Sequence, residues 1–140
     1  MSYRLETDNI HFENKVPRSV FVKQVNYDLF FQLIYNLINN AIRYNKSNGS
    51  ISVSGAQEPG KAFILQIADT GIGIRKDDLS GIFNRFKKFG RQNNEGYGLG
   101  LSIVKTITTF LGFHIEVASE PGEGTVFSLV IPGELASNKQ

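Results

Sequence analysis

The chain contains no cysteine, and this absence excludes three kinds of chemistry at once. Disulfide frameworks, thiolate nucleophiles and zinc–thiolate sites all require cysteine. An excess of charge of one sign is also absent, because 15 Lys and Arg are balanced by 13 Asp and Glu, and the two signs alternate along the chain. Proteins that bind nucleic acid usually carry a basic run or face, so we expect no nucleic-acid partner.

Long hydrophobic runs are missing as well. The most apolar stretch, residues 29–42, is interrupted by Gln32 and three asparagines. It therefore falls short of the ~20 apolar residues that a membrane span needs. The first nine residues lack the apolar core of a secretory signal. We expect a cytoplasmic domain without direct membrane contact, which either stands alone or forms the cytosolic part of a membrane-anchored sensor.

What the chain does have is enough apolar material for one core, since 41% of its 140 residues are hydrophobic. No internal repeat is visible, and no linker divides the chain. We therefore expect residues 1–140 to form a single domain with its core at about 9–132 and a frayed tail at 133–140.

The spacing of apolar residues predicts the secondary structure. Alternation indicates strands at 9–15, 19–25, 51–55, 63–67, 113–119 and 125–131. Spacing by three and four residues indicates long helices at 28–44 and 99–111 and a short one at 77–86, and residues 87–96 are expected to form a mobile loop. This order predicts an α/β (α+β) fold, a two-layer α/β sandwich whose mixed, mostly antiparallel sheet is covered on one face by helices.

The first long helix carries an unusual polar face. At 100° per residue, Gln32, Asn36, Asn39, Asn40 and Arg43 fall on one side of it. Asparagine is a poor helix former, so three of them in five residues cost stability. One interpretation is a tolerant polar surface. The other is a row of amide oxygens that bind a hard cation, with the arginine placed to meet phosphate, which suits a magnesium–nucleotide complex.

Two glycine-rich segments offer further candidate sites. Asp69 is followed by Gly71 and Gly73, which are either ordinary turn residues or let the backbone approach a ligand whose exocyclic amine the carboxylate accepts. Such a carboxylate selects adenine over guanine. Three alternating glycines, at 96, 98 and 100, open the second long helix and indicate either a phosphate site or a flexible first turn.

Several other features are given structural interpretations. The segment from Gly55 to Lys61 resembles a phosphate-binding Walker loop, but Ala62 stands where a magnesium-binding hydroxyl is needed. His11 and His114 have no carboxylate or histidine partner in their strand patterns, so we expect structural or surface roles for them. The phenylalanines at 83, 86 and 89 are interpreted as core or lid packing.

Taken together and in this order, five segments resemble the ATP-binding catalytic domain of sensor histidine kinases. This family lies in the wider superfamily of gyrase-type, heat-shock-chaperone and mismatch-repair ATPases. The segments are NLINNAIRYN (36–45) as the N box, DTGIGI (69–74) as the first glycine box, IFNRFKKF (82–89) as the F box, GYGLGLSIVK (96–105) as the second glycine box, and GEGTVFSL (122–129) as the closing strand. The similarity runs from about residue 10 to residue 132.

The resemblance implies a Bergerat-type ATP-binding fold with ATP and Mg²⁺ as cofactors. It implies that Asn40 coordinates Mg²⁺, that Asn40 and Arg43 act in catalysis, and that Asp69 binds the adenine amino group. Residues 87–95 become the ATP lid, seated by Phe83 and Phe86. The remaining residues of the implied nucleotide site are Asn36, Tyr44, Gly71, Gly73, Ile74, Arg85, Gly96, Gly98, Leu99, Gly100, Leu101 and Thr125.

The implied activity is transfer of the γ-phosphoryl group of Mg-ATP to a histidine on a separate dimerisation and phosphoacceptor domain, which serves a response regulator. The chain departs from the family pattern at Lys88, where an arginine is common, and it lacks the acceptor helix with its histidine box. The alternatives left open are an anti-sigma-type protein-serine kinase, a gated ATPase and a non-catalytic nucleotide-sensing module of the same fold. A dimeric aspartic protease, suggested by Asp69-Thr70-Gly71, conflicts with the two long helices.

Overall fold

The computed structural model describes residues 9–18, 20–22, 25–57, 60–84, 95–133 and 136–138. Within these ranges the chain forms seven strands and three helices. In chain order they are β1 (His11–Lys15), β2 (Val20–Val22), α2 (Tyr27–Arg43), β3 (Ser50–Gln57), β4 (Phe63–Asp69), α3 (Lys76–Leu79), α4 (Glu95–Leu111), β5 (His114–Glu120), β6 (Gly124–Ile131) and β7 (Ala136–Asn138).

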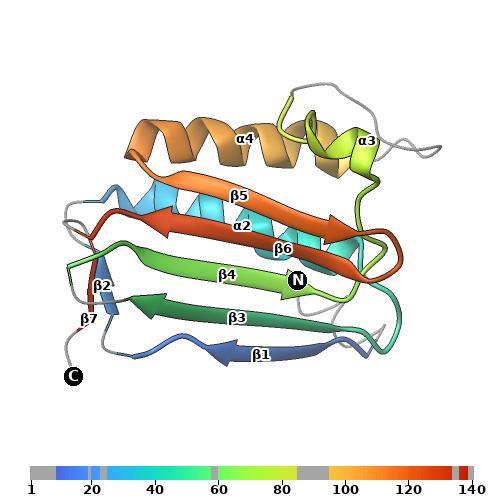
Figure 1. Ribbon diagram of the computed structural model, residues 1–140, viewed down its shortest axis with the longest axis horizontal. Helices are drawn as coiled ribbons and strands as arrows, with labels where there is room; N and C mark the ends of the chain where they lie inside the picture. Colours follow the sequence, from blue (N-terminus) through green and yellow to red (C-terminus); the bar gives the residue numbers. More distant parts are fainter. Residues whose placement is uncertain are drawn as a thin grey trace.

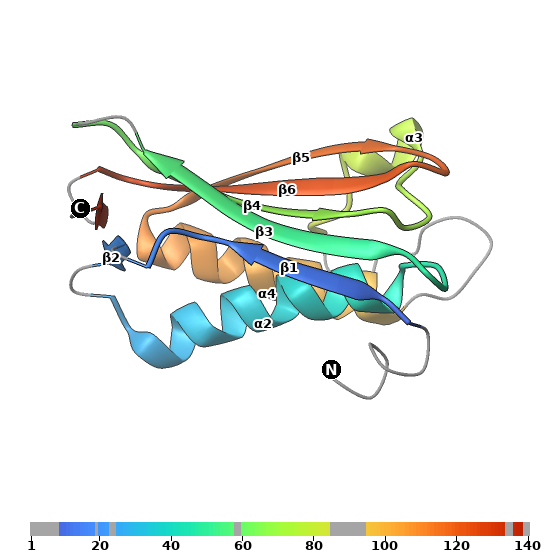
Figure 2. The same ribbon diagram turned by 90° about the horizontal axis from the view of Figure 1, so that it is seen from below.

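Five strands form one sheet in the order β1-β3-β4-β6-β5. β1 runs parallel to β3, and the other neighbouring pairs are antiparallel. The long helices α2 and α4 pack against each other and cover one face of this sheet (Figures 1 and 2). The predicted two-layer sandwich with a mixed, mostly antiparallel sheet is confirmed.

The core lies between the sheet and the two helices. Along β4 the side chains of Phe63, Leu65 and Ile67 are buried, whereas Ile64 and Gln66 between them are exposed. This period of two places one face of the sheet against the helices and leaves the other to solvent. The helices complete the core with one buried stripe each, which includes Leu33, Leu37 and Ala41 of α2 and Leu101, Val104 and Ile107 of α4.

Local signals in the sequence explain where α2 begins and ends. The Asn26 side chain accepts a hydrogen bond of 3.1 Å from the backbone N–H of Leu29, which caps the helix, and Asp28 lies in the first turn. Arg43 lies in the last turn, where a cation is favourable. The predicted helix at 28–44 is thus confirmed to within one residue at each end.

The predicted boundaries of α3 and α4 were wrong. α3 covers four residues, because a turn with a 3.0 Å hydrogen bond from Gly81 N–H to Asp78 O follows directly after it. α4 begins at Glu95 instead of residue 99, so Gly96, expected in the loop, is helical. Glycine lowers helix propensity but adopts helical dihedral angles readily, and packing of α4 on α2 outweighs that cost. Residues 85–94, with most of the expected loop, lie outside the described residues.

The expectation of a frayed tail was also wrong for part of the C-terminal segment. Residues Ala136–Asn138 form β7, which pairs antiparallel with β2 in a separate two-stranded sheet, with Val22 opposite Ala136. Six strands were expected, and the described part of the chain contains seven. The pairing satisfies backbone groups that a short isolated strand would leave open, and the polar sequence Ala-Ser-Asn gave no sign of it.

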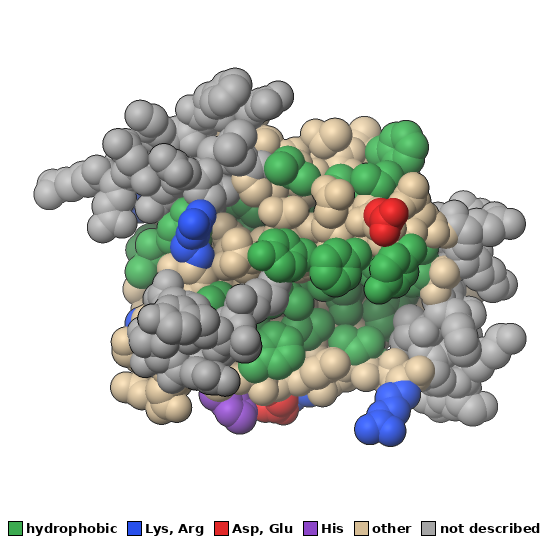
Figure 3. Space-filling model, turned by 180° about the vertical axis from the view of Figure 1, so that it is seen from behind, with side chains coloured by type: hydrophobic (Ala, Val, Ile, Leu, Met, Phe, Trp, Pro, Cys, Tyr) green, Lys and Arg blue, Asp and Glu red, His purple; other side chains and the backbone are tan. Residues whose placement is uncertain are grey.

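One exposed face of the molecule is aromatic. The rings of Tyr27, Phe31 and Tyr35 lie along α2 at intervals of four residues, with centroids 6.4 Å and 6.1 Å apart. All three side chains are exposed, and Tyr27 keeps 75% of its surface accessible. Figure 3 shows apolar side chains gathered on this helical side of the molecule.

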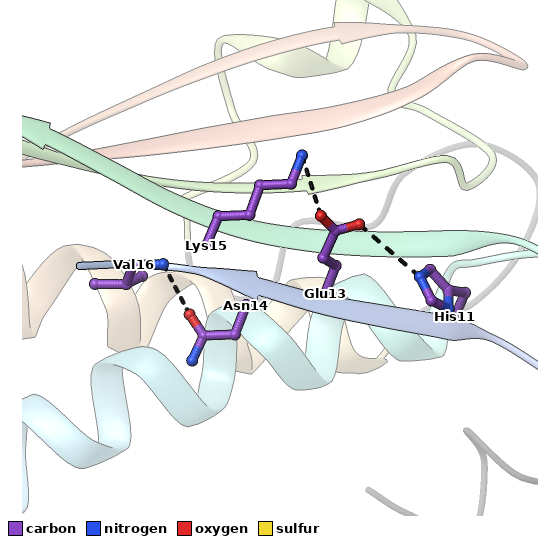
Figure 4. A network of polar contacts seen from close by, with 5 residues as sticks. All are labelled: His11, Glu13, Asn14, Lys15 and Val16. Carbon is purple, nitrogen blue, oxygen red and sulfur yellow. Dashed lines mark hydrogen bonds and ion pairs between the residues drawn. The ribbon is translucent and has the colours of Figure 1, made fainter. Parts of the chain in front are cut away.

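The outer face of β1, at one edge of the sheet, is polar. Glu13 lies between a lysine and a histidine on this strand, with Lys15 Nζ 3.3 Å and His11 Nε2 3.9 Å from its carboxylate oxygens (Figure 4). The expectation that His11 and His114 have no carboxylate partner was therefore wrong, since His114 Nε2 also lies 3.3 Å from Glu116 Oε2. All five residues of β1 are exposed. Among the described residues, no helix is long and apolar enough to cross a membrane.

Candidate nucleotide site

The candidate site is centred on Asp69, the last residue of β4. Its Oδ1 accepts a 2.8 Å hydrogen bond from the backbone N–H of Gly71, and Thr125 of β6 lies opposite it in the sheet. Burial raises the pKa of the Asp69 carboxyl from 3.8 to about 6, although backbone hydrogen bonds from Gly71 and Thr125 lower it. A carboxylate in such surroundings gains most from a ligand that donates a hydrogen bond.

The loop after Asp69 is held on two sides by backbone hydrogen bonds. The N–H of Ile72 donates to the carbonyl of Tyr44 at the end of α2 (3.0 Å), and the carbonyl of Ile72 accepts from Gly122 in the β5–β6 turn (2.8 Å). A Cβ atom at Gly71 would lie 2.2 Å from the Tyr44 carbonyl oxygen, so only glycine fits there. The loop is thereby fixed between α2 and the hairpin.

A second cluster of hydrogen bonds fixes the end of α2 against the end of β4. Asn45 is 6% exposed; its Nδ2 donates to the carbonyl of Ser50 (3.0 Å), and its Oδ1 accepts from the Thr70 hydroxyl (3.2 Å). The same hydroxyl oxygen accepts from the Ser50 N–H (2.8 Å). These contacts fix the end of α2, and with it the Tyr44 carbonyl that accepts the hydrogen bond from the Ile72 N–H. Neither Asn45 nor Thr70 was predicted as a supporting residue, because both look like ordinary turn residues.

Ser119 of β5 was missed too. Its hydroxyl oxygen accepts from the N–H of Ile74 (2.7 Å) and lies 2.9 Å from the hydroxyl of Thr125. A signal for it existed, because the expected hairpin of 113–119 and 125–131 places Ser119 opposite Thr125, as the register confirms.

The predicted phosphate end lies along α2 and α4. Asn40 is 8% exposed and Asn36 is half-buried. A Cβ atom at Gly100 of α4 would meet Asn36 Oδ1 at 3.5 Å, so these two predicted residues are neighbours. The five polar residues expected on one side of this helix differ in exposure: Gln32 and Arg43 are exposed, Asn36 and Asn39 are half-buried and Asn40 is buried.

The other predicted residues divide between the core and segments outside the description. Ile74 and Leu101 belong to the core cluster, and the backbone of Gly73 lies against Glu120. Gly96 and Gly98 lie in the first turn of α4. Phe83 packs edge-on against Phe127, with ring centroids 6.4 Å apart. Outside the described part of the chain lie the side chain of Leu99 and the whole of Arg85, Phe86 and lid residues 87–94.

Hydrogen bonds and strand pairing thus bring five of the predicted residues into one corner, at the end of the sheet nearest the C-terminus of α2: Tyr44, Asp69, Gly71, Ile74 and Thr125. No group of three histidines or acidic residues that could hold a metal ion occurs among the described residues. A divalent cation would therefore need ligands from elsewhere, and nucleotide phosphates are suitable ones. The arrangement offers a partly buried hydrogen-bond acceptor at one end and an amide-rich helix at the other, as expected for a nucleotide site.

Comparison with known families agrees with this interpretation. Residues 25–135 match the model of the histidine kinase-, DNA gyrase B- and HSP90-like ATPases. The chain belongs to this family.

Within the family, the similarity is to sensor histidine kinases of two-component systems. The adaptive-response sensory kinase SasA of Synechococcus elongatus is 35% identical over 118 residues, which cover 84% of this chain and 30% of SasA. The solved mycobacterial sensor histidine kinase MprB superposes with a TM-score of 0.76 at 26% identity, covering 94% of this chain and 91% of that one. Full-length ShkA, solved in complex with AMPPNP, superposes with a TM-score of 0.77 at 25% identity, covering 94% of this chain and 27% of that one.

The curated relatives are longer than this chain. It spans 26% of a sensor-like histidine kinase from Rhizobium meliloti and 24% of the sensor kinase YclK from Bacillus subtilis.

Proposed function

We propose that this chain binds Mg-ATP and donates its γ-phosphoryl group to a histidine on a separate dimerisation and phosphoacceptor domain of a sensor kinase. The observation that carries the proposal is the partly buried Asp69 carboxylate at the end of β4, which accepts a hydrogen bond from the Gly71 N–H and lies opposite Thr125. The 6-amino group of adenine is a donor that this acceptor binds, whereas the 6-carbonyl of guanine is repelled by it. The AMPPNP bound to the relative ShkA is an adenine nucleotide, which supports the same choice here.

The base and the phosphates would occupy opposite ends of the site. Tyr44, Gly71, Gly73, Ile74 and Thr125 would surround the base next to Asp69. Asn36, Arg43, Arg85 and the α4 residues Gly96, Gly98, Leu99, Gly100 and Leu101 would line the phosphate end. The positive end of the α4 dipole favours phosphate there.

Magnesium would arrive with the nucleotide. Neutral amide oxygens are weak ligands on their own, and the described residues hold no acidic cluster, so Asn40 fits a cation already bound to phosphates. When bound, the cation neutralises charge that develops on the transferred phosphoryl group. Asn40 and Arg43 would position the phosphates for this step.

The remaining parts of the reaction would come from other domains. Transfer of a phosphoryl group depends mainly on positioning and charge neutralisation, and the group that accepts the imidazole proton would belong to the acceptor domain. A response regulator would then take the phosphoryl group from that histidine. We propose that residues 1–140 form one catalytic domain that works in the cytoplasm, in contact with neither nucleic acid nor the membrane.

Calorimetric titration with ADP and Mg²⁺ tests the nucleotide site. We expect saturable binding of ADP, much weaker binding of GDP, and a loss of at least about tenfold in ADP affinity in Asp69→Asn, because an amide hydrogen then faces the donor amine. The matched control is Asp28→Asn, which makes the same exchange at an exposed position of α2 and should bind like the wild type. Equal affinity for ADP and GDP would refute the adenine site.

Transfer is tested with γ-labelled ATP and the purified dimerisation and acceptor domain of the parent kinase. Asn40→Ala should reduce the label on the acceptor histidine by about a hundredfold while adenosine still binds, as expected when a group that positions phosphates is lost. Asn39→Ala, the half-buried neighbour, is the control. Transfer at the wild-type rate by Asn40→Ala would contradict the assigned role.

A further inference from the structure

The Ser119 hydroxyl joins three segments of the site. Ser119 lies in β5, and its Oγ accepts from the Ile74 N–H at 2.7 Å. The same oxygen lies 2.8 Å from the Gly124 carbonyl oxygen and 2.9 Å from Thr125 Oγ1. The loop after β4 and the start of β6 therefore meet at a single hydroxyl.

Counting protons fixes the direction of each hydrogen bond. A serine hydroxyl has one proton to donate and two lone pairs to accept. The Gly124 carbonyl can only accept, so the Ser119 proton must lie between Oγ and that carbonyl. The Ile74 N–H can only donate, so it occupies one lone pair. The contact with Thr125 uses the other lone pair, and Thr125 is therefore the donor in it.

We propose that Ser119 is a positioning residue that determines base specificity by consuming the only proton of the Thr125 hydroxyl. This inference rests on the proposed function, in which Thr125 lies beside the base. With its proton committed, Thr125 Oγ1 offers only lone pairs to the base. It then favours a 6-amino group, which donates, over a 6-carbonyl, which accepts.

Thr125 Oγ1 and the Asp69 carboxylate both favour a base that donates a hydrogen bond. Thr125 and Asp69 are opposite each other in the β4–β6 register, so the ionised carboxylate and the oriented hydroxyl belong to the same corner. Thr125 is 4% exposed, and a hydroxyl buried to that extent must have its proton satisfied within the protein. A 6-oxopurine finds no donor in this pair, and an adenine base finds two acceptors.

The test compares ADP with inosine diphosphate, whose base carries a carbonyl at position 6. Ser119→Ala frees the Thr125 proton to turn toward that carbonyl. We expect the preference of the wild-type chain for ADP to fall by about fivefold to tenfold in Ser119→Ala, which is the scale of one hydrogen bond. Ser119→Thr restores a hydroxyl at the same position and should restore the preference.

The matched control is Ser128→Ala. Ser128 lies in β6 and accepts from Gln66 Nε2 at 3.2 Å, away from Ile74 and Thr125, so its loss should leave the preference unchanged. If Ser119→Ala does not fold, Thr125→Val replaces it, because removing the acceptor oxygen should also reduce the preference. Thermal unfolding of each variant shows which of them are folded.

Three results separate the possible failures. A selective wild type together with a Ser119→Ala variant of unchanged preference would overturn the role of Ser119 alone. A loss of affinity by the same factor for both nucleotides would also overturn it, since that is the effect of a structural support. A wild-type chain without preference for ADP would overturn the proposed function as well.

Discussion

Changing the ionisation of Asp69 should move nucleotide affinity and folding stability in opposite directions. Burial raises the pKa of this carboxyl to about 6, against 3.8 for the free group. Its charged form binds a donor amine, whereas its neutral form suits the buried position better. Lowering the pH from 8 to 5 should therefore weaken nucleotide binding and remove a destabilising charge from the folded chain.

The expected magnitudes follow from the pKa. If only the ionised form binds the adenine amine, the dissociation constant should double near pH 6 and rise about tenfold at pH 5 relative to pH 8. The folded pKa lies above the unfolded value, so the cost of the charge is full above pH 6 and is relieved as the pH falls toward 3.8. The difference between 3.8 and about 6 corresponds to about 3 kcal/mol.

Asp69→Asn isolates this effect. At pH 8 the variant should be more stable than the wild type by about 1 to 2 kcal/mol, because the amide avoids the buried charge but loses about 1 kcal/mol of acceptor strength toward the Gly71 and Thr125 N–H groups. The difference between the two chains should shrink as the pH falls to 5. Urea unfolding at several pH values measures it.

Affinity is measured against pH with adenosine as well as ADP, because the terminal phosphate of ADP also titrates near pH 6. The weakening toward pH 5 should appear with adenosine in the wild type and should be absent with adenosine in Asp69→Asn, whereas ADP keeps the part that its own phosphate contributes in both chains. An adenosine affinity that is constant from pH 8 to 5, or a stability difference that does not change with pH, would refute the assignment of a buried, ligand-binding carboxylate.

Two further predictions concern the support of the site. Gly124→Ala should lower the free energy of unfolding by about 3 kcal/mol or more and abolish ADP binding, because φ is +124° there and a Cβ would lie 1.9 Å from the Asp69 carbonyl oxygen. Gly122→Ala, where φ is +83° but the space is open, should lower it by about 1 to 2 kcal/mol. Equal losses for the two variants in urea unfolding would contradict the steric argument. Leu33→Ala, at a fully buried position, should lower stability by about 2 to 5 kcal/mol, while Phe31→Ala, which removes an exposed ring stacked on Tyr27 and Tyr35, should lower it by only about 1 kcal/mol.

The parts of the fold that follow hydrophobic periodicity were predictable from the sequence. The alternation of Phe63, Leu65 and Ile67 gave β4, and the apolar stripe of α2 gave that helix to within one residue at each end. Strand β7 was not predictable, because three polar or small residues carry no period and their partner β2 is more than a hundred residues away in the sequence.

For the candidate site, the residues expected to contact the ligand could be predicted from the sequence, but the residues that hold them in place could not. Asp69, Gly71 and Thr125 were expected beside the base, and the structure places them in contact or in register. Ser119 and Asn45 act through hydrogen bonds between segments far apart in the sequence, and such bonds depend on distances that only the folded chain defines. Their single hydroxyl or amide gives no periodic signal.

The two edges of the sheet also affect how the chain behaves in concentrated solution. Edge strands present unpaired backbone groups on which a strand of another molecule can add. β1 forms one edge and carries exposed His11, Glu13 and Lys15, and β5 forms the other edge and carries exposed His114 and Glu116. Adding a strand at either edge would bring charged side chains against a neighbouring copy and strip them of water. Exposed polar side chains that contribute little to folding are thus expected to oppose pairing of the sheet with another copy.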